Sequence, residues 1–118
     1  MSGLVSHLKG RAAEDRVLRA YRDAGHRLLC QRWRGPAGEI DLVLEKDGEI
    51  VFVEVKSSRS FAAAAAHLTR RQIARLMASA EAALGFFPKG SLTPMRFDVA
   101  LVDGGGRVDV IPNALQAA

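Results

Sequence analysis

The fold is decided by residues 38–56, which read GEIDLVLEK, then DG, then EIVFVEVK. Apolar and polar residues alternate on both sides of the pair Asp47 and Gly48. An Asp-Gly pair between two alternating runs is the strongest short-range signal for a β-hairpin with a two-residue type I′ turn. With these two residues as the loop, Lys46 lies opposite Glu49, and this pairing fixes the register of the whole hairpin.

This register brings charged residues together at the end of the hairpin that lies far from the turn. It sets Asp41 opposite Glu54 and Glu39 opposite Lys56. Two directly opposed carboxylates repel each other, so a hairpin selected only for stability would avoid the first pair. A bound divalent cation removes the repulsion, because oxygen ligands are those that Mg²⁺ prefers. The register therefore indicates a candidate metal site.

The two faces of the hairpin follow from the two-residue period of a strand. One face is wholly apolar and is expected to be buried; it comprises Ile40, Leu42, Leu44, Val51, Val53 and Val55. The other face is largely apolar near the turn and charged at its far end. Lys56 shares this second face with Glu54, about 6.6–6.8 Å further along the strand. It is therefore a candidate to orient an attacking water or to stabilise negative charge on a phosphate.

The composition indicates one soluble globular domain that spans residues 1–118, with 48% hydrophobic and 25% charged residues. The single cysteine, Cys30, excludes an internal disulfide and a cysteine-rich zinc site, and favours a reducing compartment such as the cytoplasm. No stretch approaches the roughly 20 apolar residues of a membrane span, so no membrane partner is expected. The net charge of +4 is compatible with a polyanionic partner.

The remaining segments predict an α/β fold. Helical spacing of apolar residues indicates a first helix over residues 6–24, and a Thr69–Gln72 capping box begins a second helix that ends at Gly85. Further strands are expected over residues 27–33, 95–102 and 107–111, and residues 57–68 are expected to form a loop. This order predicts a sheet of about five strands flanked by helices.

Two groups of charged residues on the predicted helices have both a structural and a functional interpretation. Glu14 lies on the apolar side of the first helix, and its position alone favours a side chain that reaches water at the edge of the apolar stripe. Arg70, Arg71 and Arg75 begin the second helix, where cations oppose the macrodipole by roughly a few tenths of a kcal/mol each. Phosphate binding and a merely solvated basic turn explain these arginines equally well.

Residues 38–41 followed by residues 51–56 resemble the PD-(D/E)xK nuclease superfamily, which has the restriction-endonuclease-like fold. More closely, the chain is similar to the YraN-like family of small bacterial proteins over nearly its whole length. Besides the hairpin, the shared motifs are residues 10–14, Ala20 with Tyr21, Arg59 with Phe61, residues 69–76, residues 96–98, and Asn113 with Ala114. The resemblance implies a three-layer core with a mixed central sheet.

The resemblance also implies roles for particular residues. Asp41, Glu54 and Lys56 would be catalytic, and Glu14, Asp41 and Glu54 would bind Mg²⁺, for which Mn²⁺ is the expected substitute. This reverses the interpretation of Glu14 that the pattern alone favours. Glu39 would be accessory, either paired with Lys56 or hydrogen-bonded behind the metal ligands. Gln72 stands where many members of the superfamily place a polar residue near the site, although its capping role explains it without that.

Two positions depart from the pattern of the family. Arg71 stands where the family usually has lysine, so phosphate binding is kept but proton transfer at this position is not. Ala62 stands where the family usually has glycine, which leaves the conformation of the following segment open. Together with Arg71, the residues expected to contact a nucleic-acid backbone are Arg59, Arg70 and Arg75.

Three functional hypotheses follow. The first is an Mg²⁺-dependent endonuclease that cuts branched or otherwise structured DNA, as related Holliday-junction resolvases do. The second is a nucleic-acid-binding module on the same fold that has no independent cleavage activity. The third is a structural hairpin with a surface Glu39–Lys56 ion pair, and it ranks last because it must tolerate the opposed Asp41 and Glu54. A homodimer would supply two active sites for cutting two strands, but the sequence leaves the oligomeric state and the choice between DNA and RNA open.

Overall fold

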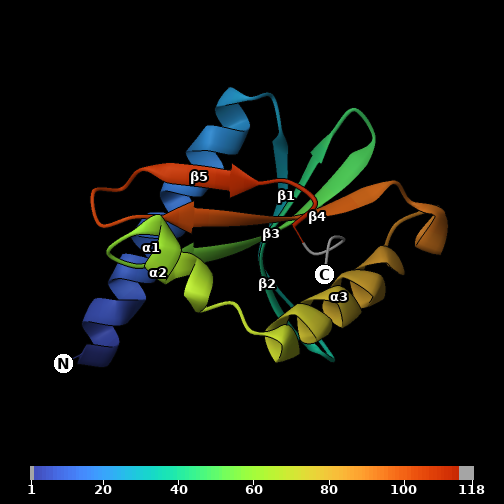
Figure 1. The fold of residues 1–118 in the computed structure, drawn as a ribbon. Helices are drawn as coiled ribbons and strands as arrows, with labels where there is room; N and C mark the ends of the chain where they lie inside the picture. The colour runs from blue at the N-terminus through green and yellow to red at the C-terminus, as the bar shows by residue number, and fades with distance from the viewer. Residues whose placement is uncertain (1, 115–118) are drawn as a thin grey trace.

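Five strands form one mixed sheet in the order in which they occur in the chain (Figure 1). They are β1 (Arg27–Gly35), β2 (Gly38–Lys46), β3 (Glu49–Ser57), β4 (Met95–Val102) and β5 (Val108–Ile111). Strands β3 and β4 run parallel, and the other neighbouring strands run antiparallel. The computed structural model describes residues 2–114, with side chains from residue 10 onward.

The helices cover both faces of the sheet and make a three-layer α/β fold. Helix α1 (Ser2–Asp23) packs on one face, where Val17 and Tyr21 meet Leu42 and Val51 in one buried cluster. Helices α2 (Phe61–Ala66) and α3 (Arg70–Leu84) lie on the opposite face (Figure 1). They form the connection that the parallel pair β3 and β4 requires. This architecture confirms the predicted restriction-endonuclease-like fold class.

The predicted hairpin is confirmed over most of its length. Asp47 and Gly48 have φ angles of +52° and +83°, as a type I′ turn requires at both central positions. Strands β2 and β3 pair in the expected register from Lys46 opposite Glu49 to Leu42 opposite Val53. The expectation that Ile40 and Leu42 share one face of the hairpin is wrong. Ile40 packs in the cluster beneath α3, whereas Leu42 packs beneath α1.

The segment predicted as a loop over residues 57–68 contains helix α2, so that expectation is wrong for residues 61–66. Ser60 caps the helix, since its Oγ accepts a hydrogen bond from the Ala63 N–H at 3.1 Å. Ala64 is completely buried against the sheet. Because alanine is small, the helix can approach the sheet closely, and Phe61 at its first turn also packs against this core.

Helix α3 begins as predicted at the capping box. The Gln72 N–H donates to Thr69 Oγ1 at 3.1 Å, and the Thr69 N–H donates to Gln72 Oε1 at 3.3 Å. The helix ends at Leu84, directly before Gly85. A short 3₁₀ helix over Gly90–Leu92 interrupts the loop that leads to β4. No helix in the part of the chain that the structure describes is long and apolar enough to cross a membrane.

A buried polar network fixes α1 against β4. Tyr21 Oη donates to Asp98 Oδ2 at 2.7 Å, Arg96 Nε donates to Asp98 Oδ1 at 3.1 Å, and the Asn113 N–H donates to the same oxygen at 3.1 Å. Asp98 is completely buried. Arg96, Asp98 and Asn113 belong to the motifs that the chain shares with the YraN-like family, and this network gives them a structural role away from the acidic site. It also holds Glu14, two helical turns before Tyr21, over the sheet.

Candidate metal and nucleic-acid site

The site begins where strands β2 and β3 separate. Their recorded pairing ends at Leu42 opposite Val53, and Asp41 does not continue it as a ladder residue. Instead, the Val55 N–H donates a hydrogen bond to Asp41 Oδ2 at 2.8 Å. A side-chain oxygen thus supplies the acceptor for a backbone donor of β3. This bond anchors the Asp41 carboxylate beside the next strand.

Glu54 is the buried partner of Asp41 and is only 9% exposed. Burial, a hydrogen bond with Asp41 and the negative charge of Asp41 together raise the pKa of Glu54 to about 8, and Lys56 acts in the opposite direction. The proximity of these two carboxyl groups, predicted from the hairpin register, is therefore confirmed.

Lys56 contacts Glu54 rather than Glu39. Its Nζ lies 3.2 Å from Glu54 Oε2, and only 16% of the Lys56 side chain is exposed. The expected Glu39–Lys56 pair is wrong, since Glu39 Oε2 lies 3.3 Å from Arg34 Nε. The reason is the ladder between β1 and β2, which places Arg34 opposite Glu39. Lys56 is therefore a largely buried cation that belongs to the acidic pair.

Glu14 approaches the same region from α1. Its side chain is 13% exposed, and burial followed by the charge of Asp41 raises the pKa of its carboxyl group. The Glu14 side chain is thus largely buried, in keeping with the interpretation that the resemblance implies rather than with the one that the pattern alone favours. Arg32 Nη2 lies 3.0 Å from Glu14 Oε1, yet this oxygen is buried without a well-formed hydrogen bond among the described residues. Arg32 itself has a left-handed φ of +52° within β1.

The donor set can be compared with what Mg²⁺ requires. Among residues that the structure describes, no group of three or more His, Cys, Asp or Glu side chains is arranged to hold a metal ion. Asp41 and Glu54 meet, whereas Glu14 is tied to Arg32. Mg²⁺ is commonly bound through one or two carboxylates, with water and substrate phosphates as its other ligands. The Asp41–Glu54 pair fits such a site, and the unsatisfied Glu14 oxygen lies on its α1 side.

A cavity of about 340 Å³ opens beside the acidic pair, on the side of α3. Its lining residues are Gly38, Glu39, Asp41, Glu54, Gln72, Arg75, Leu76 and Ser79. Ser79 Oγ donates to the Gly38 carbonyl at 3.2 Å and joins α3 to the start of β2. Arg75 lies against Gly38, where a Cβ atom would stand 3.4 Å from Arg75 Cδ. Helix α3 therefore brings one cation and one amide to the acidic cavity.

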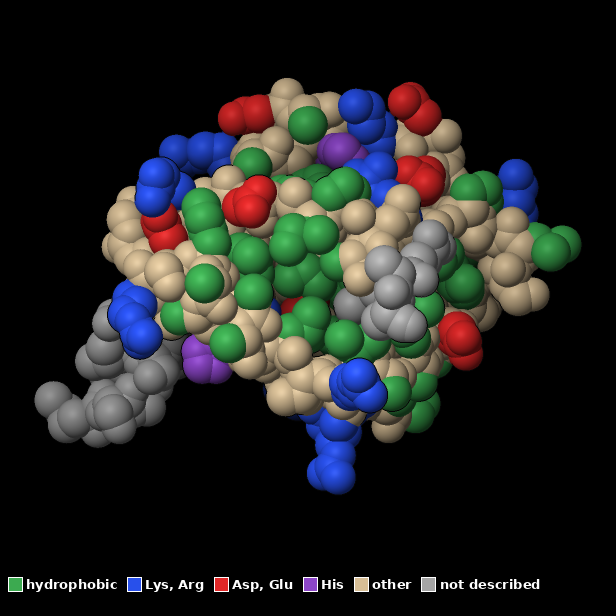
Figure 2. Space-filling model, in the orientation of Figure 1, with side chains coloured by type: hydrophobic (Ala, Val, Ile, Leu, Met, Phe, Trp, Pro, Cys, Tyr) green, Lys and Arg blue, Asp and Glu red, His purple; other side chains and the backbone are tan. Residues whose placement is uncertain are grey.

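The other predicted phosphate contacts are more scattered. Arg70 and Arg71 are exposed in the first turn of α3 and do not line the acidic cavity, and Arg59 lines a different cavity. Figure 2 shows Lys and Arg side chains at separate places around the edge of one face, with hydrophobic side chains nearer its centre. On that face the basic residues do not form one continuous patch.

Sequence reasoning missed two residues of the site, Arg32 and Ser79. The register of β1 against β2 could have revealed Arg32. In this register Gln31 lies opposite Leu42 and Trp33 lies opposite Ile40. That register places Arg32 beside Asp41. Ser79 had no signal of this kind, because its partner is a backbone carbonyl on a distant strand.

Comparison with known proteins gives the family. The model of the Uncharacterised protein family UPF0102 matches residues 13–102. The chain belongs to this family. It is 55% identical over 112 residues to a UPF0102 protein of Ruegeria pomeroyi, which covers 95% of the chain and 91% of that protein. It is 52% identical over 117 residues to a UPF0102 protein of Cereibacter sphaeroides, over 99% of the chain and all of that protein.

Membership of UPF0102 confirms the YraN-like resemblance. The matched residues 13–102 include Glu14 on α1, the whole hairpin and Arg75 on α3. The acidic pair, its lysine and its cavity thus lie entirely within the part of the chain that defines the family.

Proposed function

We propose that this UPF0102 protein is an Mg²⁺-dependent endonuclease that hydrolyses phosphodiester bonds in branched or otherwise structured DNA. The observation that carries the proposal is the pairing of the half-buried Asp41 with the buried Glu54, whose Oε2 lies 3.2 Å from Lys56 Nζ. Two adjacent carboxylates that are partly withdrawn from water destabilise a fold unless a positive charge compensates them. Lys56 compensates one negative charge, and a divalent cation would compensate the other.

Asp41 and Glu54 would hold the metal ion. When bound, Mg²⁺ would neutralise phosphate charge and lower the pKa of a coordinated water. The hydrogen bond from Val55 to Asp41 Oδ2 fixes the orientation of this carboxylate before any ligand arrives. Glu54 is held from the opposite side by Lys56. The chain would thus present a preorganised pair of oxygen donors, which favours electrostatic catalysis.

Lys56 would act on the reacting groups. The Lys56 ammonium would donate a hydrogen bond to the attacking water or to a phosphate oxygen. Its low exposure strengthens that interaction, because a partly buried cation is less screened than one in bulk water. A lysine in this position would stabilise the negative charge that develops as the phosphodiester is cleaved.

The size of the acidic cavity supports a structured substrate. About 340 Å³ is near the lower limit of small-ligand pockets and suits one sugar-phosphate unit rather than an intact double helix. A strand can enter such a space where it leaves the duplex, as at a branch or a flap. Arg75 lines the cavity, and its guanidinium group would donate hydrogen bonds to the phosphate. Arg70 and Arg71, in the same helix, would contact the strand outside.

A nucleic-acid-binding module without cleavage is the second candidate function. The observation that favours it is the ion pair between Glu14 and Arg32, which leaves Asp41 and Glu54, rather than all three predicted ligands, for a metal ion. A two-carboxylate site binds Mg²⁺ less tightly and depends more on substrate phosphates for its remaining ligands. Such a protein would bind nucleic acid and would cut it only with help from a partner.

Cleavage assays distinguish the two functions. Purified protein is incubated with four-way junction, flap, single-stranded and duplex DNA, and with matched RNA, in Mg²⁺, Mn²⁺ or EDTA. Wild type should nick a branched or flapped substrate only with a divalent cation. Lys56→Ala should lower the rate about 100-fold or more while binding persists. Lys89→Ala, which removes an exposed lysine that does not line the cavity, is the matched control.

Two other outcomes would decide against the nuclease. Strongly salt-dependent binding without cleavage of any substrate would favour the binding module. A failure to bind any nucleic acid would reject both functions. Sedimentation of the protein with and without junction DNA would show whether two copies assemble, as the cutting of both strands would require.

A further inference from the structure

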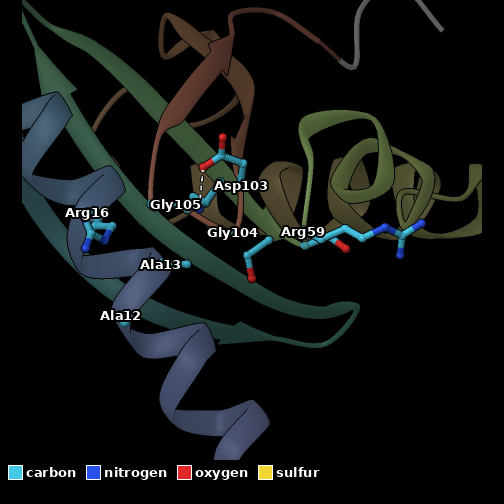
Figure 3. Close-up of a pocket in the computed structure, with 11 residues that line it drawn as sticks. Ala12, Ala13, Arg16, Arg59, Asp103, Gly104 and Gly105 are labelled. Carbon is cyan, nitrogen blue, oxygen red and sulfur yellow. Dashed lines mark hydrogen bonds between the residues drawn. The ribbon is translucent and has the colours of Figure 1, made fainter.

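A second and larger cavity, of about 590 Å³, lies on the α1 side of the sheet. It opens where the parallel strands β3 and β4 end, at the last pair of Ser57 and Val102. The carboxyl ends of neighbouring parallel strands are a common place for ligands in α/β proteins. The cavity is lined by residues 12, 13 and 16 of α1, residues 57–59, and residues 102–106 (Figure 3).

The turn over residues 103–106 forms a fixed wall of this cavity. Asp103 Oδ1 accepts hydrogen bonds from the Gly105 and Arg107 N–H groups at 3.0 and 2.9 Å. Arg107 Nε lies 2.8 Å from Asp103 Oδ2. The backbone bond from Arg107 is the main reason that the pKa of Asp103 is lowered. The one carboxylate that lines the cavity is therefore already neutralised by its neighbour.

Arg16 faces this wall with an uncompensated charge. Its guanidinium lies against Gly106, where a Cβ atom would stand 2.6 Å from Arg16 Cζ. Arg16 has no ion pair within the described part of the chain. Residues 1–9 and 115–118 contain no aspartate or glutamate that could pair with Arg16. The cavity thus carries positive charge and suits an anion.

Hydroxyl groups accompany this charge. Ser57 and Ser58 line the cavity, and no hydrogen bond is recorded for either hydroxyl in the part of the chain that the structure describes. Arg59 contributes its backbone, whose carbonyl accepts from the Gly104 N–H at 3.3 Å. Its side chain extends away from Arg16 and the glycine turn (Figure 3). One free guanidinium and two free hydroxyls are donors of the kind that bind phosphate.

We propose that this cavity binds a phosphate group of the nucleic-acid strand that occupies the acidic site. Both sites lie at the carboxyl end of β3, where Ser57 follows Lys56, with the acidic cavity on the α3 side of the sheet and this cavity on the α1 side. A strand whose scissile group lies at the acidic pair would therefore reach Arg16 by passing over this end of the sheet, with a phosphate further along the strand. The volume is within the range of small-ligand pockets and accommodates a whole nucleotide around that phosphate. This inference rests on the proposed function.

Binding without cleavage tests the inference. The affinity of a fluorescein-labelled junction and of a single strand is measured by anisotropy in EDTA at several salt concentrations. Arg16→Gln should weaken binding about tenfold or more and reduce the salt slope by about one phosphate contact. Arg19→Gln is the matched control, because Arg19 is also an exposed arginine of α1 and does not line the cavity. Equal effects of the two substitutions would overturn the proposal.

A second variant keeps the fold while it blocks the site. Ala12 is exposed and lies four residues before Arg16, so Ala12→Glu should form an i,i+4 ion pair that stabilises the helix. The new carboxylate would neutralise Arg16 and repel phosphate. Ala12→Glu should therefore lose DNA affinity as Arg16→Gln does, with an unchanged or raised melting temperature. Wild-type affinity in this variant would overturn the proposal.

The remaining outcomes separate this inference from the proposed function. Binding that depends on Arg16 without any cleavage would keep the phosphate site and reject the nuclease. Cleavage with binding that is independent of Arg16 would reject the phosphate site alone. Titration with deoxyadenosine monophosphate distinguishes a free nucleotide from a strand. If it binds through Arg16 and DNA does not, the assignment to a strand is overturned.

Discussion

The Asp41 carboxylate accepts the hydrogen bond that the Val55 N–H donates, at 2.8 Å. This bond lies directly beyond the last recorded ladder pair, Leu42 with Val53. Asp41 therefore has two roles that different substitutions can separate. Its oxygen completes the hydrogen bonding of β3, and its charge raises the pKa of Glu54. The first role is structural, and the second would favour the binding of a cation.

Asparagine at position 41 should remove the charge and keep the acceptor. Asp41→Asn is expected to fold with near wild-type stability, since its amide oxygen can still accept from Val55. Asp41→Ala leaves that N–H without a partner and should cost about 1–3 kcal/mol. Mn²⁺ should raise the melting temperature of the wild type, and both variants should lose this rise. Urea denaturation and thermal shift with and without Mn²⁺ measure the two effects. A Mn²⁺ shift retained by Asp41→Asn would exclude Asp41 as a ligand.

Glu54 should make the metal-free protein less stable as the pH rises. Its folded pKa is about 8 against an ordinary value of 4.5, so the folded state binds more protons between these values. The free energy of unfolding therefore falls as the pH rises between these two pKa values, by a few kcal/mol at most, and stays constant at higher pH. Glu54→Gln should flatten this dependence in EDTA. Glu81→Gln, at an exposed position of α3, should leave it unchanged. Unfolding free energies at pH 5, 6.5 and 8 measure it, and parallel curves for wild type and Glu54→Gln would contradict it.

The hairpin and the start of α3 could be predicted because their determinants are local. The Asp47-Gly48 turn has the positive φ angles that these residues tolerate, and the Thr69–Gln72 capping box needs only residues one turn apart. Helix α2 could not be predicted in the same way. Its alanines carry helix propensity, but the burial of Ala64 against the sheet is a tertiary effect.

The sequence predicted which residues of the site lie opposite each other, but it did not predict where the strands depart from regular pairing. The register found that Asp41 and Glu54 meet, because strand geometry relates distant residues by simple pairing. It failed beyond Leu42, where a side chain replaces a backbone acceptor and Ile40 changes face. The left-handed φ of Arg32 had no signal either, since a non-glycine residue rarely adopts it within a strand.

The Glu14–Arg32 ion pair should contribute more to the free energy of unfolding than the exposed Glu39–Arg34 pair. Its side chains are 13% and 31% exposed, whereas those of Glu39 and Arg34 are 36% and 86% exposed. Arg32→Ala would leave a buried carboxylate without its partner and should cost about 2 kcal/mol. Arg34→Ala should cost less than about 1 kcal/mol. Urea denaturation at pH 7.5 measures both.

Glu14→Gln provides the test of the mechanism. It should recover much of the stability that Arg32→Ala loses, because an uncharged amide is cheaper to bury than an unpaired carboxylate. The coupling energy from this double-mutant cycle should exceed that of the Arg34–Glu39 cycle. Equal coupling in the two cycles would show that the Glu14–Arg32 pair is as well solvated as a surface pair.

The network of Tyr21 and Asp98 should contribute to stability and not to the acidic site. Tyr21→Phe removes the hydroxyl that donates to the completely buried Asp98 at 2.7 Å, and should cost about 1.5–3 kcal/mol. Arg96 and the Asn113 N–H still hold the carboxylate, so the protein should fold and keep its Mn²⁺ shift. Asp98→Ala breaks every bond of the network and should be much more damaging. Melting temperatures in EDTA and in Mn²⁺ measure both effects. A Mn²⁺ shift lost in Tyr21→Phe would mean that the position of α1, and with it Glu14, controls the metal site.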